Sequence, residues 1–113
     1  MKKIEALLRP HQLEELKETL YGKGLLPGVT ATELRGYERG VSERSIYRGV
    51  AQTIDLFARV KIEIIAHDEL VPPLARAISK TVAGDRHACE ILVSEVAEVV
   101  RIRTGEIDEA AIA

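Results

Sequence analysis

The chain has 113 residues, of which 46% are hydrophobic and 30% charged, with one cysteine and a formal net charge of −2. This balance lacks the large basic excess on which general nucleic-acid and membrane-surface binders rely, and a single cysteine excludes an internal disulfide framework. There is no secretory signal pattern and no apolar run of about 18 residues, so we expect one soluble, cytoplasmic globular domain over residues 1–113.

The first half of the chain has the pattern strand, helix, strand. Alternating side chains predict a strand over residues 1–9, with the even-numbered positions sharing its apolar face. Leucines at helical spacing predict an amphipathic helix over residues 12–21, which ends at the glycines that follow. A threonine-rich alternation then predicts a second strand over residues 29–37.

The second half repeats this order after a long connection. Residues 38–55 show no sustained periodicity, and connections beyond ~12–15 residues in a compact domain are usually functional or mobile, so we predict a long mobile loop. Residues 60–66 show the strongest strand alternation, and we expect this strand to lie centrally in the sheet. Asp68 is expected to cap the next helix, which ends near Gly84, and residues 90–95 predict a short strand.

Two strand–helix–strand halves of similar pattern predict a particular fold class. It is an α+β fold of the split βαβ kind, with the order βαββαβ, an antiparallel sheet and both helices on one face. We expect an additional short strand at residues 99–106 and a C-terminal tail over residues 104–113.

The stretch at residues 99–106, VVRIRTGE, predicts an anion site. In an extended chain Arg101 and Arg103 point to the same face, about 7 Å apart. Two guanidiniums at this spacing suit a polyphosphate, because each is a permanently charged fork that pairs bidentately with phosphate oxygens. The alternative is a solvated edge strand, where like charges cost little.

The sequence contains no recognisable catalytic set. There is no GxSxG elbow, no Walker loop and no metalloprotease helix, so we do not expect an enzyme. His87 and Cys89 would share one side of an extended segment and could hold a soft metal, but two ligands do not complete a tetrahedral site. Cys89 is more simply explained as a small, partly buried hydrophobic residue.

Four separated stretches resemble the PII signal-transduction family. They are residues 1–6 (MKKIEA), 47–49 (YRG), 60–63 (VKIE) and 100–106 (VRIRTGE). The resemblance implies a ferredoxin-like subunit, a homotrimer and adenine-nucleotide pockets between subunits. It also makes residues 38–55 the T-loop, the arm that changes shape with ligand and docks onto partner proteins.

The phosphate loop of the family is altered in this chain. It reads TGKIGDGK in the family and AGDRHACE at residues 83–90, where only the first glycine, Gly84, is kept and the last lysine becomes Glu90. An acid where a triphosphate would place negative charge predicts weakened ATP binding, whereas the retained arginine pair suits ADP or AMP. Arg86 or His87 would replace part of the lost positive charge.

The T-loop departs from the family at two positions. Gly40 falls where the family carries the glutamine that holds magnesium and 2-oxoglutarate, and glycine has no side chain that could coordinate either. Gln52 takes the place of the tyrosine that some members carry for nucleotidylation. The chain therefore resembles divergent PII-like proteins, among which are carboxysome-associated members that respond to adenine nucleotide and bicarbonate.

We accordingly predict a trimeric regulatory protein that binds ADP or AMP, and ATP more weakly, between its subunits. It would signal through residues 38–55 to an unidentified transporter or enzyme, and a small anion such as bicarbonate would act together with the nucleotide. We expect no obligatory cofactor or metal, no nucleic-acid binding and no membrane insertion. By the resemblance, the candidate nucleotide-binding residues are Thr30, Gly36, Glu63, Gly84, Arg86, His87, Arg101 and Arg103. The candidate anion and loop residues are Arg39, Arg44, Tyr47 and Arg48.

Two other functions stay open at this point. One is a trimeric ferredoxin-like metal-tolerance protein that uses His87 and Cys89. The other is a structural oligomer without a ligand. Thermal melting with ADP, ATP, Cu(II) and Zn(II) added separately would distinguish the three, because a ligand that binds only the folded state raises its melting temperature.

Overall fold

The structure is a computed structural model that describes residues 1–25, 28–36, 45–47, 50–52, 57–84 and 90–112. Most of the predicted loop over residues 38–55 lies outside the described residues, as do Gly40 and Cys89. Five candidate site residues also lie outside them, namely Arg39, Arg44, Arg48, Arg86 and His87.

Four strands form one antiparallel sheet in the order β2–β5–β1–β6. These strands are β1 (Lys2–Leu8), β2 (Val29–Gly36), β5 (Phe57–Ala66) and β6 (Leu92–Glu95). Strand β5 pairs with β1 from Val60↔Leu8 to Ala66↔Lys2 and with β2 from Phe57↔Gly36 to Ile64↔Val29. The central position predicted for residues 60–66 is confirmed, because β5 has a neighbour on each side.

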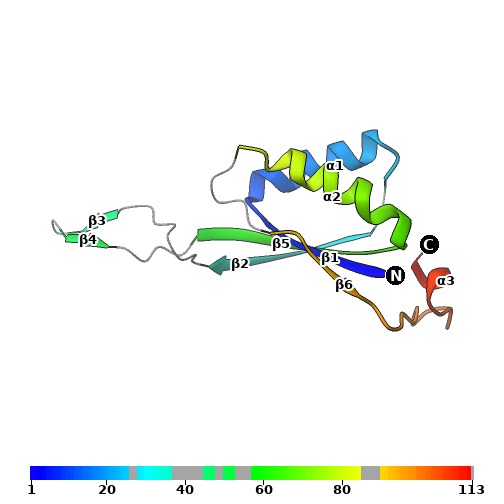
Figure 1. The fold of residues 1–113 in the computed structure, drawn as a ribbon. Coiled ribbons are helices and arrows are strands. Elements are labelled where there is room, and N and C mark those ends of the chain that lie inside the picture. The colour runs from blue at the N-terminus through cyan, green and yellow to red at the C-terminus, as the bar shows by residue number, and fades with distance from the viewer. Residues whose placement is uncertain (26–27, 37–44, 48–49, 53–56, 85–89, 113) are drawn as a thin grey trace.

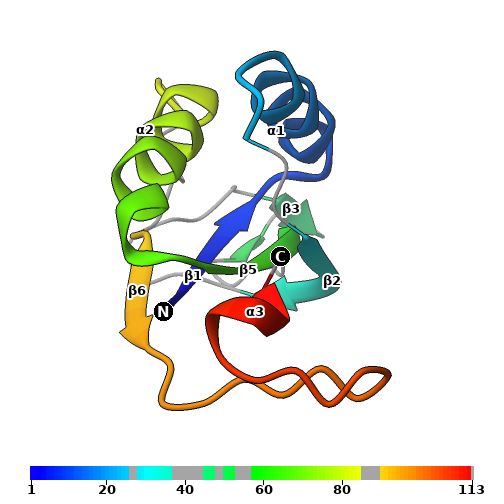
Figure 2. The same ribbon diagram turned by 90° about the vertical axis from the view of Figure 1, so that its right-hand side faces the viewer.

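Helices α1 (Pro10–Gly22) and α2 (Val71–Thr81) lie together on one face of the sheet, as Figure 2 shows. This arrangement confirms the split βαβ fold. The core between helices and sheet is apolar, and its buried members are Ile4, Ala6, Leu8, Leu16, Leu20, Val60, Ile62, Ile64, Ala66, Leu74, Ala77 and Ile78. Because strand side chains alternate, the intervening residues of β1 and β5 point to the opposite face, which we call the open face.

Helix α1 begins at Pro10, two residues earlier than predicted. Proline is well suited to the first turn because its missing N–H would have no partner there. Gln12 explains the early start: its side-chain Oε1 accepts a hydrogen bond from the Arg9 N–H at 2.8 Å, and its backbone N–H donates to the Arg9 carbonyl at 3.0 Å. Gln12 is therefore a buried polar residue whose side chain caps a helix.

Asp68 does not cap α2, so that prediction is wrong. A 3-10 turn, η1 (Asp68–Leu70), precedes α2, and the N-cap residue of α2 is Leu70, without a side-chain cap. The Asp68 carboxylate instead accepts a hydrogen bond from the N-terminal ammonium of Met1 at 2.8 Å. This bond lowers the pKa of the Asp68 carboxyl and raises the pKa of the N-terminal amine.

Part of the long connection forms a short hairpin that the sequence did not predict. Strands β3 (Ser45–Tyr47) and β4 (Val50–Gln52) pair antiparallel, and both are drawn well away from the four-stranded sheet in Figure 1. Strands of three residues are too short to produce a recognisable alternation.

Residues 99–106 do not form the additional strand that was predicted. The Arg101 N–H donates to the Glu106 carbonyl and the Gly105 N–H donates to the Arg101 carbonyl, each at 2.8 Å, which closes a turn. Gly105 has φ +74°, a conformation that glycine adopts without the steric cost of a side chain. Only an isolated bridge, Val100↔Ile107, remains of the strand, and the short helix α3 (Glu109–Ile112) follows.

Among the described residues, no helix combines the length and the apolar character that crossing a membrane would require.

Candidate functional site

A cavity of about 250 Å³ lies on the open face of the sheet. Its lining residues come from β2 and its approach, from β5 and from the C-terminal segment, and they are Gly28, Thr30, Glu63, Ile65, Val99, Ala111 and Ile112. Thr30 and Glu63 are direct partners across the β2–β5 ladder. We call this site the Thr30–Glu63 cavity.

The charges next to this cavity on the open face are paired. Lys61 Nζ lies 3.3 Å from the Glu63 carboxylate. Glu5, which is opposite Glu63 on β1, has Lys3 Nζ at 2.7 Å. The hydrogen bond from Lys3 lowers the pKa of the Glu5 carboxyl and raises the pKa of Lys3 itself. Each of the two facing carboxylates thus has its own lysine.

The C-terminal segment forms the third wall of the cavity. The Asp108 N–H donates to the Val99 carbonyl at 2.7 Å, and the Val99 N–H donates to Asp108 Oδ1 at 3.4 Å. These bonds bring α3 back against the open face, opposite α1 and α2 (Figure 2). Arg101 Nη2 then donates to the carbonyl of Ala111, a lining residue, at 3.0 Å, so its guanidinium lies at the rim of the cavity.

The structure brings some of the predicted site residues together and separates others. Thr30 and Glu63 share the cavity and Arg101 is at its rim, whereas Arg103 is exposed in the turn that follows. The prediction that both arginines project from one face of a strand is wrong, because residues 102–104 form a turn. Gly36 and Gly84 do not line this cavity.

Sequence reasoning missed five lining residues, which are Gly28, Ile65, Val99, Ala111 and Ile112. A signal for Ile65 was present, because it is an isoleucine at a position whose neighbours on the same strand face, Lys61 and Glu63, are charged. Val99, Ala111 and Ile112 depend on how the C-terminal segment turns back, and no local pattern in the sequence indicates that.

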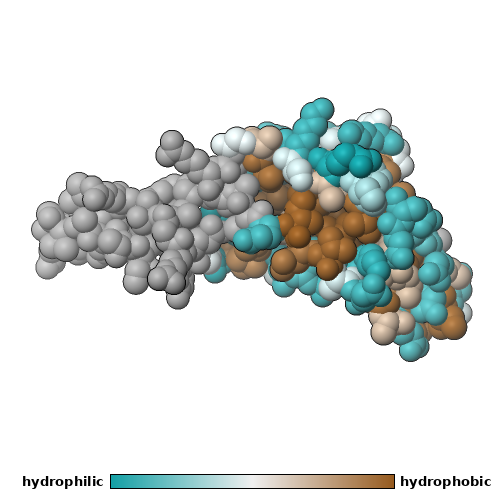
Figure 3. Space-filling view, viewed as in Figure 1, coloured by the Kyte–Doolittle hydropathy of each residue, from teal (hydrophilic) through white to brown (hydrophobic). Residues whose placement is uncertain are grey.

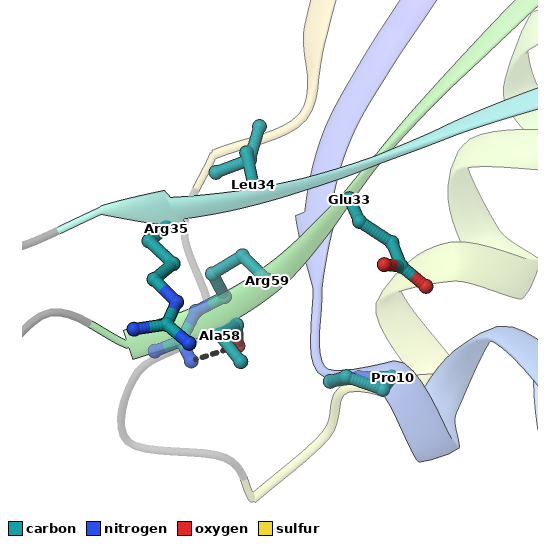
Figure 4. Close-up of a pocket in the computed structure, with 6 residues that line it drawn as sticks. All are labelled: Pro10, Glu33, Leu34, Arg35, Ala58 and Arg59. Carbon is teal, nitrogen blue, oxygen red and sulfur yellow. Dashed lines mark hydrogen bonds between the residues drawn. The ribbon is translucent and has the colours of Figure 1, made fainter.

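A second cavity, of about 370 Å³, lies where β2 ends and β5 begins (Figure 4). It is lined by Pro10, Glu33, Leu34, Arg35, Ala58 and Arg59. Arg59 is only 7% exposed, and its Nη1 donates to the Ala58 carbonyl at 3.1 Å. We call this site the Arg35–Arg59 cavity; neither arginine was among the predicted site residues.

Within the described part of the chain, no cluster of three or more His, Cys, Asp or Glu residues could hold a metal ion. His87 and Cys89, the residues of the metal-tolerance alternative, lie outside that part.

Residues 1–106 match the family described as nitrogen regulatory protein P-II. The chain belongs to the P-II family. It is 43% identical over 107 residues to the nitrogen regulatory protein P-II of Mesorhizobium japonicum, an alignment that covers 94% of this chain and 95% of that protein. It is 40% identical over 113 residues to nitrogen regulatory protein P-II 1 of Escherichia coli K12, covering 99% and 100% of the two chains.

This membership confirms the resemblance found in the sequence. The protein is a P-II-like regulatory protein, and neither the family nor the described residues support the metal-tolerance alternative.

Proposed function

We propose that this P-II regulatory protein binds an adenine nucleotide in the Thr30–Glu63 cavity and reports the bound nucleotide to a partner protein through residues 38–55. One observation carries the proposal. Thr30 and Glu63, which the family resemblance assigned to the nucleotide from distant parts of the sequence, are paired across two strands and line one cavity with Arg101 at its rim.

The lining of the cavity suits a purine base. Ile65 and Val99 offer apolar surface to the faces of a flat ring. The Glu63 carboxylate can accept a hydrogen bond from an exocyclic amino group, and the Thr30 hydroxyl can donate to a ring nitrogen. A guanine presents a carbonyl oxygen at the equivalent edge. It would place an acceptor against the Glu63 carboxylate, so the cavity should favour adenine over guanine.

The charged residues assigned to the phosphates suit a nucleotide with few of them. Arg101 and Arg103 would take phosphate oxygens through charge-assisted hydrogen bonds. Glu90 is exposed and stands where the family carries the last lysine of its phosphate loop, so it would repel a terminal phosphate. ADP and AMP should therefore bind at least as tightly as ATP.

The volume of the cavity supports a site shared between subunits. About 250 Å³ is slightly less than the ~300–1,000 Å³ typical of small-molecule sites, and a neighbouring subunit would enlarge and close it. In the homotrimer that the family implies, residues 83–90 of that subunit, including Gly84, Arg86 and His87, would face the phosphates. Gly36 would let the chain pivot into the loop that carries Arg39, Arg44, Tyr47 and Arg48.

A small anion such as bicarbonate would act as second ligand next to the loop. No cofactor is needed for a regulator of this kind, because its output is a change in which partner it binds. The partner would be a transporter or an enzyme.

Calorimetric titration of ADP, AMP and ATP into the full chain tests the nucleotide assignment. Because Arg103 is exposed, Arg103→Ala should leave the fold intact. Loss of one charge-assisted contact costs ~1.5–3 kcal/mol, so ADP should bind about tenfold or more weakly. Arg76→Ala, at an exposed arginine of α2, is the matched control. Unchanged ADP affinity in Arg103→Ala and Glu63→Gln would refute the assignment.

The reading of Glu90 has its own test. Glu90→Lys should raise the affinity for ATP more than the affinity for ADP, because the new cation would meet the terminal phosphate. A wild-type chain that already binds ATP more tightly than ADP would show that Glu90 does not face the phosphates.

A further inference from the structure

We propose that helix α3 and the ligand compete for the Thr30–Glu63 cavity, so that the C-terminal segment sets how tightly the ligand binds. We call residues 108–112 the strap. The strap closes one side of the cavity, and a bound ligand would displace it from the sheet. The proposal rests on the proposed function, because it names a regulation of that same site.

The strap covers part of the surface that the ligand needs. Ala111 and Ile112 are two of the seven residues that line the cavity, and both are half-buried. With the strap in place the cavity measures about 250 Å³, which is less than the ~300–1,000 Å³ typical of small-molecule sites. Figure 2 shows α3 on the face of the sheet opposite α1 and α2, so its departure would open the cavity on this side.

The strap also engages the cation that would hold phosphate. Arg101 Nη2 donates to the Ala111 carbonyl at 3.0 Å, and Arg101 Nη1 lies 3.8 Å from the Glu106 carboxylate. Both terminal nitrogens of this guanidinium therefore face the C-terminal segment of the same chain. A bidentate contact with phosphate through these nitrogens would replace the Ala111 carbonyl and release the strap.

The strap has little stability of its own. Helix α3 has four residues, and isolated helices shorter than ~12–15 residues are marginal in water. Asp108, directly before α3, has φ +54°, which is uncommon for a residue with a side chain. Its N–H donates to the Val99 carbonyl at 2.7 Å. Asp108 is thus the anchor at which the chain turns back, and residues 109–112 would leave the sheet while this anchor is kept.

Competition with the strap lowers the affinity for the ligand by the fraction of molecules in which the strap is released. A ligand that binds only the released form has an apparent dissociation constant equal to the intrinsic one divided by that fraction. One hydrogen bond, such as that from Arg101 to Ala111, changes such a population by about fivefold. We therefore expect wild-type ADP affinity to be about fivefold lower than that of a chain whose strap cannot close.

A strap that supports the ligand as a fixed wall predicts the opposite effect. Ile112 would then contact the bound base, and removing its apolar surface would weaken binding. The sign of the change in ADP affinity therefore decides between competition and support.

Calorimetric titration of ADP into the full chain measures this sign. Ile112→Ser removes apolar contact between the strap and the cavity, and Ala111→Pro removes the N–H that donates to the Asp108 carbonyl at 2.9 Å. Both variants should bind ADP about three- to fivefold more tightly than the wild type. Ala110→Ser, at an exposed position of α3 outside the cavity lining, should bind as the wild type does. Weaker or unchanged ADP binding in both strap variants would overturn the proposal.

Backbone amide relaxation measures the displacement itself. Order parameters are about 0.85 for a rigid backbone and below about 0.6 for a flexible one. At saturation with ADP, the order parameters of Ala111 and Ile112 should fall below about 0.6, whereas that of Ile62 in β5 should not change. Unchanged or higher order parameters in the strap would contradict the competition.

The same titrations separate this proposal from the proposed function. If the wild type binds ADP and Arg103→Ala weakens it, but the strap variants bind no more tightly, the competition is refuted and the proposed function stands. If neither the wild type nor Ile112→Ser binds ADP, the proposed function fails, and the competition fails with it.

Discussion

Arg101 and Arg103 are two residues apart and have the same chemistry, but the structure gives them different surroundings. Arg101 donates to the Ala111 carbonyl and lies 3.8 Å from the Glu106 carboxylate, so it helps to hold the C-terminal segment against the sheet. Arg103 is exposed in the turn. Arg101 therefore combines a structural role with its proposed binding role, whereas Arg103 is available for binding alone.

This difference predicts different effects of the two alanine variants on stability. Arg101→Ala should lower the free energy of unfolding by about 1 kcal/mol, the usual net value of one hydrogen bond. Arg103→Ala should change it by less than ~0.5 kcal/mol, as surface substitutions do. Urea unfolding of both variants without ligand measures this. Equal losses would mean that the contact between Arg101 and Ala111 does not stabilise the fold.

The bond between the N-terminal ammonium and Asp68 predicts a pH dependence of stability. The pKa of Asp68 is lowered from 3.8, so the carboxylate stabilises the fold above that value and its contribution is lost as the pH falls through the lowered pKa. The pKa of the amine is raised from 8.0, so its contribution is present below 8.0 and is lost as the pH rises through the raised pKa. The bond should therefore contribute most between these two values.

Asp68→Asn should consequently lower the urea midpoint slightly near neutral pH and progressively less toward either extreme. Both groups are exposed, so the effect should be small. Glu69→Gln, the neighbouring exposed acid, is the control and should behave as the wild type. A midpoint difference that stays constant from acid to alkaline pH would contradict the assigned bond.

Among the elements, those with a long apolar periodicity could be predicted from the sequence. Strands β1 and β5 and helices α1 and α2 each bury one alternating or helical set of residues, and this pattern is visible without a structure. The prediction of a strand in the C-terminal stretch was wrong for a physical reason. The alternation over VRIR indicated a strand, but the turn at Thr104–Gly105 and the hydrogen bond from Asp108 to Val99 depend on contacts beyond the local pattern.

The residues of the candidate site likewise fall into those that the sequence indicated and those that it did not. Thr30 and Glu63 were predicted by the family resemblance, and the β-alternation places them on one face. The wall made by Ala111 and Ile112 required the path of the C-terminal segment, and the Arg35–Arg59 cavity required the pairing of β2 with β5. Neither is a property of a single stretch of sequence.

Two isoleucines on opposite faces of β5 should respond differently to replacement by alanine, one mainly in stability and the other mainly in ADP binding. Ile62 is fully buried against the helices, so Ile62→Ala should cost ~2–5 kcal/mol of stability. Ile65 is half-buried on the open face and lines the Thr30–Glu63 cavity, so Ile65→Ala should cost less stability but weaken ADP binding. Chemical unfolding and ADP titration of both variants check this. A larger stability loss for Ile65→Ala would contradict the assignment of the faces.

At the scale of the whole molecule, a single subunit leaves apolar surface uncovered. Leu92 and Val93, on successive positions of the edge strand β6, are 59% and 47% exposed. Figure 3 shows hydrophobic surface gathered below the helices, in the region where β6 runs in Figure 1. Apolar patches of this kind usually mark protein interfaces.

We therefore expect the chain to be a trimer in solution, as the family resemblance implies. Light scattering coupled to size exclusion should give a mass about three times the 12.5 kDa of the chain. Leu92→Lys should lower that mass, because it would place a charge in the interface. A wild-type mass near 12.5 kDa at micromolar concentration would contradict the expected assembly.

The most direct test of the central claim is to locate the bound base. In methyl-labelled protein saturated with ADP, the adenine protons should give nuclear Overhauser effects to the methyl groups of Ile65 and Val99, which line the Thr30–Glu63 cavity. The Leu34 methyl groups, which belong to the Arg35–Arg59 cavity, should give none. Contacts to Leu34 instead, or no adenine contacts to Ile65 and Val99 at saturation, would contradict the account.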